Sequence, residues 1–397
     1  MKRHFILFFF LPLLLTSCGK KQETMEQLAD RSIQTAVQHA KAMAMALEQQ
    51  DGLLPRSINP GTGELVTSKS RWWCSGFFPG TLWYLYEYTG DEELKTMAEA
   101  YTARIEKEKY NTGTHDLGFM LYCSFGNGLR LTGNETYPEV LETGSRSLMT
   151  RYNPVVGLIR SWDHNREKWQ YPVIIDNMMN LEMLMWAFGH TGDSAFYNVA
   201  VSHADKTIAN HFREDNSSYH VVSYDTLTGM PYLKQTHQGA SDSSIWSRGQ
   251  AWGLYGYTMM YRETGKTEYL DQADKIAGLM INHPNFPVDG VPYWDYLAPA
   301  IPNEPRDASA AAIMASALIE LSSYAGTEAL KRQYLRIAET QLRTLASPEY
   351  LAEPGSNGNF ILKHSVGSKP HQSEVDVPLT YADYYFAEAL LRWKGLL

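Results

Sequence analysis

Two aspartates, Asp116 and Asp176, each stand where the chain enters an apolar segment. Asp116 lies in "THDLGFMLYCSFG" and Asp176 in "IIDNMMNLEMLMWAFGH". Glycosidic chemistry needs one acid and a second group that manages the water or the developing charge, so two carboxylates across a cavity would suit it. Apolar neighbours such as Phe119, Met178 and Met179 would desolvate a carboxyl group and raise its pKa. A second carboxylate nearby would raise that pKa further, so one acid of the pair could hold its proton near neutral pH.

A structural role for Asp176 is also open at this point. An Asp just ahead of an apolar helix is a preferred N-cap, because its side chain accepts a hydrogen bond from a free backbone N–H group. From the Asp176 segment alone, the cap is the favoured interpretation. The sequence does not give the distance between the two carboxylates.

The segment "THQGASDSSIWSRGQAW", residues 236–252, is the densest polar and aromatic cluster of the chain. Sugars present hydroxyl edges and apolar faces, so their binding sites combine amide, hydroxyl and guanidinium donors with aromatic rings. His237, Gln238, Trp246, Arg248 and Trp252 supply this set, and Arg248 could also pair with a substrate carboxylate through two hydrogen bonds. The alternative is a hydrogen-bonded loop that leads into a helix.

A second polar loop, "HSVGSKPHQ", covers residues 364–372. Ser365, Ser368 and Lys369 have the hydroxyl and ammonium donors that suit a sulfate or carboxylate group on a sugar. A solvated loop with no ligand is the more ordinary interpretation of such a stretch.

The elements that must position these residues are helices. Thr-Gly turns recur at 89–91, 132–134, 191–193 and 264–266, and a looser Ala-Gly-Thr turn lies at 325–327. Gly just after the last periodic residue ends a helix, and Asp or Asn beside it favours a tight turn. Apolar periodicity predicts about twelve helices: 27–50, 77–89, 92–107, 117–132, 136–150, 177–190, 194–211, 247–264, 267–282, 308–325, 328–346 and 381–394.

The twelve predicted helices pair into six hairpins. The first helix of each later pair is almost entirely apolar or aromatic, whereas the second is amphipathic, so we expect an inner and an outer ring. Long connectors at 51–75, 151–175, 212–246, 284–306 and 347–379 precede the inner helices. Loops of this length inside a compact domain are usually functional, and here they would gather with Asp116 and Asp176 at one end of the ring.

Composition and charge narrow the class of protein. The 397 residues carry a formal net charge of -9 and no basic run, which argues against a nucleic-acid partner. Cys74 and Cys123 are too few for a disulfide framework and have no His or Cys at ligand spacing, so we predict buried thiols and no structural zinc.

The amino terminus has the build of a bacterial secretory signal, with Lys and Arg, an apolar run from Phe5 to Leu15 and then "LTSC". It resembles a lipoprotein signal, which implies removal of residues 1–17 and acylation of Cys18. We therefore expect a membrane-anchored lipoprotein, periplasmic or outer-membrane associated, with residues 18–26 as a tether and 27–397 as one catalytic domain. The membrane would be a partner only through the lipid.

The phrases "THDLGF", "IIDNMMNL", "GHTGD", "THQGASDSSIWSRGQAW" and "PLTYADYYFAEALLR" together resemble the unsaturated glucuronyl hydrolases of glycoside hydrolase family 88. The resemblance runs from about residue 27 to the end. It implies an all-α fold, the (α/α)6 barrel, and removal of the 4,5-unsaturated uronic acid that lyases leave at the non-reducing end of glycosaminoglycan oligosaccharides. No metal or organic cofactor is implied.

The same resemblance assigns roles to individual residues. Asp176 corresponds to the acid that protonates C4 of the C4=C5 double bond, and Asp116 to the second carboxylate. Positions that would contact the substrate are, by the same matching, His220, Thr236, Gln238, Arg248 and Trp252, with Trp73, Trp162 and Trp246 as aromatic walls. Ser365, Ser368 and Lys369 resemble a loop that receives sulfated amino sugars in some members, although here the Lys directly follows the second Ser.

Three alternatives are open from the sequence. An unsaturated rhamnogalacturonyl hydrolase would use a similar barrel on pectin fragments, but the cluster at 236–252 points away from it. A non-catalytic glycan-binding lipoprotein would not need two paired acids. A polysaccharide lyase would need a Tyr or His base beside an Arg, and no clear pair of that kind is evident.

Overall fold

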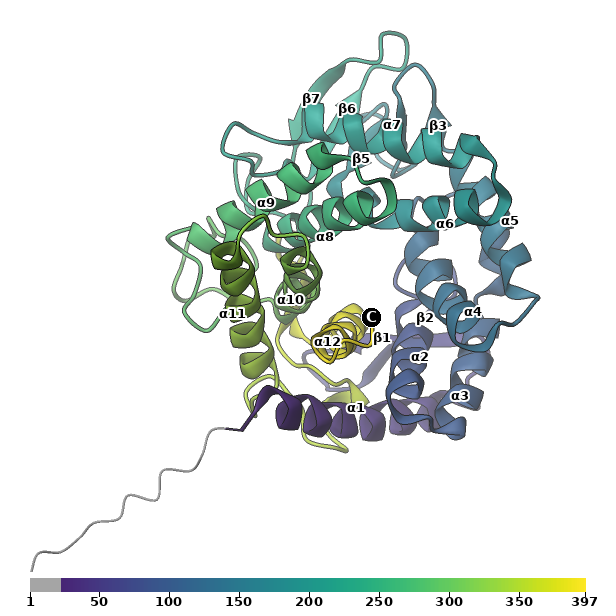
Figure 1. Cartoon of the computed structure of the whole chain (residues 1–397), viewed down its shortest axis with the longest axis vertical. Helices are drawn as coiled ribbons and strands as arrows, with labels where there is room; N and C mark the ends of the chain where they lie inside the picture. The colour runs from purple at the N-terminus through teal and green to yellow at the C-terminus, as the bar shows by residue number, and fades with distance from the viewer. Residues whose placement is uncertain (1–22) are drawn as a thin grey trace, which may run out of the picture.

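The computed structural model describes residues 23–397, and these form two concentric rings of helices (Figure 1). The predicted lipoprotein signal, with Cys18, lies outside the described residues. In Figure 1, α1, α3 and α11 lie on the outside of the ring, and α2, α10 and α12 lie nearer its centre. The outer helices are α1 (Met25–Leu47), α3 (Glu92–Ala103), α5 (Tyr137–Met149), α7 (Ser194–His211), α9 (Thr267–Asn282) and α11 (Glu328–Leu345).

The inner ring closes on itself. Around it, α12 contacts both α2 and α10, and α10 contacts α8. Two inner members begin as other helix types: the π-helix η2 continues into α4, and the 3-10 helix η3 continues into α6. The inner elements are α2 (Phe77–Thr89), η2 (Gly118–Gly126) with α4 (Asn127–Thr132), η3 (Ile175–Asn180) with α6 (Leu181–Thr191), α8 (Ser247–Thr264), α10 (Ala308–Ser322) and α12 (Thr380–Trp393).

Side-chain polarity explains which helices are inside. In α10 nearly every residue from Ala308 to Leu318 is buried, whereas α11 buries one stripe that includes Tyr334, Ala338 and Leu342. A helix that is apolar all round must be enclosed, and an amphipathic helix covers it with one face. This architecture is an (α/α)6 barrel, as the sequence predicted.

The turns between paired helices are the Thr-Gly turns of the sequence. Gly90, Gly133, Gly192 and Gly265 end α2, α4, α6 and α8 in the left-handed conformation, with φ between 65 and 72°. A residue without Cβ adopts this conformation at little cost, which is why Gly ends each helix. The prediction of the helical hairpins is confirmed at these four positions.

Short strands occupy four of the long connectors, which the helix prediction left without structure. They are all antiparallel, with pairings β1-β2, β3-β4, β5-β6-β7 and β8-β9. Their bounds are β1 (Leu53–Ile58), β2 (Leu65–Lys69), β3 (Tyr152–Asn153), β4 (Leu158–Ile159), β5 (Pro172–Ile174), β6 (Val221–Tyr224), β7 (Pro231–Gln235), β8 (Ser365–Ser368) and β9 (Ser373–Val377). These strands brace the loops at the end of the ring where the inner helices begin.

Within residues 23–397, no helix combines the length and apolar character that a bilayer crossing requires. Cys74 and Cys123 are buried free thiols, as predicted.

Candidate active site

Asp116 and Asp176 are held by two inner elements that contact each other directly. Asp116 lies two residues before η2, and Asp176 is the second residue of η3. The side chain of Asn180 in η3 accepts a hydrogen bond from the backbone N–H of Phe119 in η2, at 3.0 Å. A Cβ atom at Gly118 would lie 2.6 Å from Cα of Asn180, so only Gly permits this approach. The close packing of η2 on η3 therefore brings the two acids into one region.

Asp176 is a buried carboxyl group that does not cap a helix. The residue is 9% exposed, and η3 has no side-chain cap hydrogen bond at its start. Burial raises the pKa of Asp176 to about 7; the positive charge of Arg248 opposes this shift and the negative charge of Asp116 adds to it. The N-cap interpretation of Asp176 is wrong, because the 3-10 helix η3 takes the chain past this residue without using its oxygens. A protonated carboxyl group near neutral pH is what an acid catalyst needs.

Asp116 is in a more polar environment. Its Oδ2 accepts a hydrogen bond from the Thr114 hydroxyl at 2.6 Å, and its Oδ1 lies 3.3 Å from Nε2 of His115. Burial lowers the pKa of His115, so this imidazole is neutral and offers a dipole to Asp116 rather than a full charge. The two acids thus differ in surroundings, one desolvated and one hydrogen-bonded.

His220 faces Asp176 and its tautomer is fixed by the backbone. The N–H groups of His237 and Gln238 both donate to Nδ1 of His220, at 3.0 and 3.1 Å. Burial lowers the pKa of His220 well below its usual value, so the neutral ring must carry its proton on Nε2. That nitrogen lies 3.9 Å from Oδ2 of Asp176, and neither atom makes a hydrogen bond with any described residue. His220 can therefore donate to Asp176 or to a group that enters between them.

Aromatic rings pack on Phe119, three residues after Asp116, and on His220, which faces Asp176. Trp73 packs against Phe119 with ring centres 5.5 Å apart, and Phe119 packs against Trp252 at 5.2 Å. Trp162 and Trp246 both contact the ring of His220, at 5.8 and 4.6 Å. Two of the four predicted Trp residues thus pack on Phe119 and two on His220, and Trp252 is fully buried.

Arg248 is buried beneath the site and already engaged. Its Nη1 pairs with Asp307 at 3.1 Å and also donates to the Val366 carbonyl, while Nη2 donates to the Gly367 carbonyl at 2.6 Å. Nη1 and Nη2 of Arg248, which were predicted to pair with a substrate carboxylate, therefore already bind acceptors within the protein. What Arg248 offers the site is its fixed positive charge.

The remaining predicted contacts lie on the connectors. Thr236 accepts from the N–H of Gly239 at 2.8 Å, and Gln238 donates to the Gly367 carbonyl at 3.3 Å, so the 236–252 cluster touches the 364–372 loop. Ser365 is fully buried, whereas Ser368 is partly exposed and its hydroxyl lies 2.7 Å from Nδ1 of His371. The structure brings these loops together at the barrel mouth, and their roles in substrate contact stay predictions.

Lys369 has a partner that the sequence prediction missed. Its ammonium group pairs with Glu304, a buried carboxylate that also accepts from Nε1 of Trp294 at 2.9 Å. Glu304 lies on a different connector, 65 residues earlier, so only the fold shows this pairing. Two further residues lie at the site but were not among the predicted substrate contacts: Asp307, which caps α10 and anchors Arg248, and Tyr381, which packs 4.9 Å from Trp73.

Among the described residues, no group of three or more His, Cys, Asp or Glu side chains is arranged to hold a metal ion.

Comparison with known proteins gives one consistent family. The model of glycosyl hydrolase family 88 matches residues 55–395. The chain is 48% identical to an unsaturated glucuronyl hydrolase from Formosa agariphila, over 86% of this chain and 85% of that protein. It is 32% identical to an unsaturated chondroitin disaccharide hydrolase from Streptococcus pneumoniae, over 81% of each. A crystal structure of an unsaturated glucuronyl hydrolase specific for heparin superposes with a TM-score of 0.90 at 48% identity, covering 94% of this chain and 98% of that one.

Proposed function

The chain belongs to glycosyl hydrolase family 88, and we propose that it removes the 4,5-unsaturated uronic acid from the non-reducing end of lyase-generated glycosaminoglycan oligosaccharides. It is a glycoside hydrolase. The observation that carries the proposal is the buried Asp176, whose pKa of about 7 leaves a proton available next to a second acid. The alternatives of a pectin-fragment hydrolase and a glycan-binding lipoprotein are not favoured by these relatives.

The reaction that fits a single protonated acid is hydration of the enol ether. Asp176 transfers its proton to C4 of the C4=C5 bond, which leaves an oxocarbenium-like centre at C5. Water adds its oxygen to C5, and its released proton returns to the Asp176 carboxylate. The hemiketal at C5 opens to a ketone and leaves a hemiacetal at C1. That hemiacetal then expels the remaining sugar.

The surroundings of Asp176 support both the transfer of its proton to C4 and the return of a proton from water. Desolvation holds the proton before the transfer. After the transfer, the Nε2–H of His220 and the charge of Arg248 stabilise the carboxylate that forms, and both are fixed by the protein in advance. We infer that this pairing lets one carboxyl group act first as acid and then as base.

Asp116 would be the second carboxylate of the reaction, which binds the sugar and stabilises its developing charge. Its carboxylate is oriented by the hydroxyl of Thr114 and the ring of His115. From there it can accept hydrogen bonds from sugar hydroxyls and stabilise the positive charge that develops in the ring during protonation.

We propose that the loops at the barrel mouth set which sugar follows the unsaturated uronate. The relatives include enzymes described as acting on chondroitin disaccharides and on heparin, so glycosaminoglycan fragments are the class supported. The pairing of Lys369 with Glu304 reduces the positive charge that a sulfate group would meet there. Unsulfated or lightly sulfated disaccharides are therefore the expected substrates.

The proposal is tested by the ultraviolet absorbance of the ene-uronate group, which disappears on hydration. Lyase digests of chondroitin, hyaluronan, heparin and pectin are offered to the purified protein. We expect decay with one or more glycosaminoglycan digests and none with pectin. A protein that binds these digests without any loss of absorbance would instead be a glycan-binding protein.

We also propose that the chain is anchored to a bacterial membrane through a lipid on Cys18. The support is the sequence "LTSC" after a short apolar run. A Cys18→Ala variant should move from the membrane fraction to the soluble fraction of the expressing bacterium. Unchanged partition of the variant would contradict the anchor.

A further inference from the structure

The two residues that flank Asp176 tie it to different parts of the chain. The N–H of Ile175 donates to the carbonyl of His220 at 3.2 Å. On the other side, Nδ2 of Asn177 donates to the carbonyl of Ile159 at 2.9 Å. Because the 3-10 helix η3 starts here without a side-chain cap, these two hydrogen bonds hold the backbone that carries the Asp176 carboxyl group.

The backbone of Ile159 is also held by an outer helix. Ile159 is fully buried in β4, one strand of the two-stranded sheet β3-β4. Its N–H donates to Nδ1 of His203, in α7, at 3.0 Å. Burial lowers the pKa of His203 well below its usual value, so the ring is neutral and its proton is on Nε2. Side chains from η3 and α7 therefore satisfy both backbone polar groups of Ile159.

Three buried polar atoms near these hydrogen bonds make no hydrogen bond with any described residue. They are Oδ1 of Asn177, Nε2 of His203 and Nδ1 of His115. A buried polar atom without a partner lowers the free energy of unfolding, so stability alone gives no reason for these residue types. His115 directly precedes Asp116 and Asn177 directly follows Asp176. Their position beside the two acids indicates a role in the reaction.

Asn177 also affects the ring that contacts Asp116. Burial lowers the pKa of His115, and the charge of Asp116 and the side chain of Asn177 both oppose this shift. An amide opposes it when its oxygen faces the ring and favours the protonated imidazole. Nε2 of the same ring lies 3.3 Å from Oδ1 of Asp116. One amide side chain is therefore connected to the surroundings of both acids.

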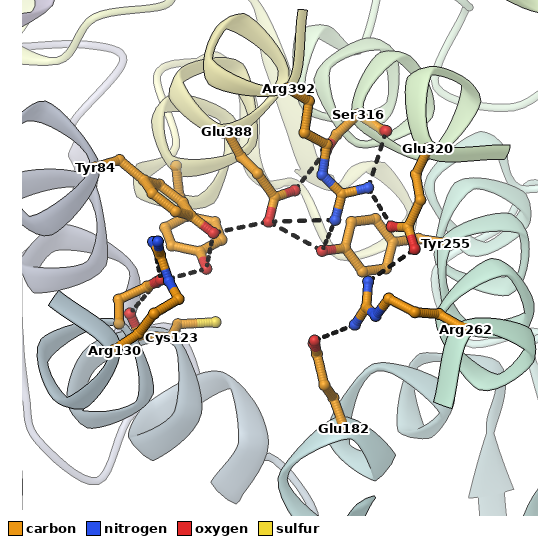
Figure 2. A network of polar contacts seen from close by, with 12 residues as sticks. Tyr84, Cys123, Arg130, Glu182, Tyr255, Arg262, Ser316, Glu320, Glu388 and Arg392 are labelled. Carbon is orange, nitrogen blue, oxygen red and sulfur yellow. Dashed lines mark hydrogen bonds and ion pairs between the residues drawn. The ribbon is translucent and has the colours of Figure 1, made fainter. Parts of the chain in front are cut away.

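Ion pairs brace the inner helices near the ends of α8, α10 and α12 (Figure 2). Arg262 of α8 pairs with Glu182 of α6 and with Glu320 of α10. Arg392 of α12 pairs with Glu320 in turn. The hydrogen bonds to Ile159 differ from this network, because they come from a neutral amide and a neutral imidazole. They hold the backbone beside the acids without adding a charge that would shift the pKa of a nearby acid.

We propose that Asn177 and His203 are positioning residues for the proton transfer. They hold the peptide groups of Ile159 from two sides and so fix the direction of the Asp176 carboxyl group. Neither residue needs to touch the substrate. The inference rests on the proposed function, because it requires Asp176 to act as the acid.

The experiment compares two amide substitutions of His203 that differ by one methylene group. His203→Asn places its amide oxygen where Nδ1 was, so it can still accept from the N–H of Ile159, whereas His203→Gln places the oxygen near the former Nε2. We expect kcat on an unsaturated disaccharide to fall by about tenfold or more in His203→Gln, with KM unchanged, because a displaced acid transfers its proton poorly. His203→Asn should keep kcat within about threefold of the wild type, since Nε2 had no partner to lose.

The pH dependence of kcat separates positioning from simple packing. Burial raises the pKa of Asp176 to about 7, so a carboxyl group that turns toward water should lose its proton at lower pH. The fall in kcat should therefore move to lower pH in His203→Gln and stay in place in His203→Asn. Asn177→Leu removes the other hydrogen bond to Ile159 and should act in the same way. The double variant Asn177→Leu/His203→Gln should lose little more than the worse single variant, because both act through one peptide.

His211→Leu is the matched control, because His211 is also a fully buried histidine of α7 and neither ring nitrogen has a partner among the described residues. It should leave kcat and the pH profile unchanged. Equal losses in His203→Asn and His203→Gln with an unmoved pH profile, or the same loss in His211→Leu, would overturn the proposal. Wild-type protein that consumes no ene-uronate would instead overturn the proposed function, and the need for a positioned acid with it.

Discussion

Nε2 of His220 lies 3.9 Å from Oδ2 of Asp176, and two backbone N–H groups on the far side of the ring fix that nitrogen as a donor. The acid is therefore desolvated on its apolar sides and faces one neutral donor. This arrangement favours a proton on Asp176 at rest and stabilises the carboxylate once the proton has left.

Replacement of Asp176 by Asn should remove the transferable proton while keeping the shape of the side chain. We expect kcat on an unsaturated disaccharide to fall by about 100-fold or more, because general acid catalysis contributes on that scale. A matched control is Asp383→Asn, since Asp383 is also buried with a pKa raised by burial to about 7, but accepts from the N–H groups of Ile361 and Leu362 in the wall. Folded Asp383→Asn should keep most of its turnover, and near wild-type turnover by Asp176→Asn would exclude the acid role.

We expect kcat on an unsaturated disaccharide to fall as pH rises through about 7. Asp176 donates a proton in the first step, and burial, its largest perturbation, raises its pKa to about 7, so the active protonated form is lost above that pH. The measurement is kcat against pH from 5 to 9 by loss of ultraviolet absorbance. A rate that keeps rising to pH 9 would contradict a protonated Asp176.

Ionisation of the buried Asp176 should lower the free energy of unfolding at alkaline pH. Its pKa in the folded protein is raised above the ordinary value of 3.8, so the stabilisation it provides is full below 3.8 and is lost as pH rises through about 7. Asp176→Asn removes this ionisation, and its gain in Tm over the wild type should grow from pH 5 to pH 8, reaching a few degrees. A gain that shrinks over this interval would mean that the native acid is not destabilised by burial.

The His220→Gln substitution should change the ionisation of Asp176 and leave the fold intact. Without the fixed donor, the carboxylate form is less stable, so we expect kcat to fall by about tenfold and the apparent pKa of the rate profile to move upward. His190→Gln, an exposed position on α6, is the control. A change in KM alone, with an unmoved pH profile, would show that His220 only holds the substrate.

Glu304→Gln should change selectivity for sulfated substrates. The neutral amide frees the charge of Lys369, which the pairing with Glu304 now reduces. We expect kcat/KM on a sulfated disaccharide to rise by about threefold or more relative to its unsulfated counterpart, because an unpaired Lys attracts an anion. Selectivity that stays constant would mean that Lys369 does not face the sulfate position.

Local sequence patterns were enough to predict most of the helices and their order. Apolar periodicity and Thr-Gly turns are local properties, so α7, α8 and α9 begin and end where the pattern predicts, at 194–211, 247–264 and 267–282. The alternation of fully apolar and amphipathic helices also predicted the two rings. The two acids were predicted as a pair because they open consecutive inner elements.

The environment of each polar group, by contrast, depends on how distant segments pack together. The 3-10 start of α6 turns Asp176 from a helix cap into a buried acid, and the contact between Gly118 and Asn180 sets the spacing of η2 and η3. Arg248 with Asp307 and Lys369 with Glu304 are pairs that lie 59 and 65 residues apart. Burial and pairing depend on groups from distant segments that close the ring, and periodicity within one segment carries no information about them.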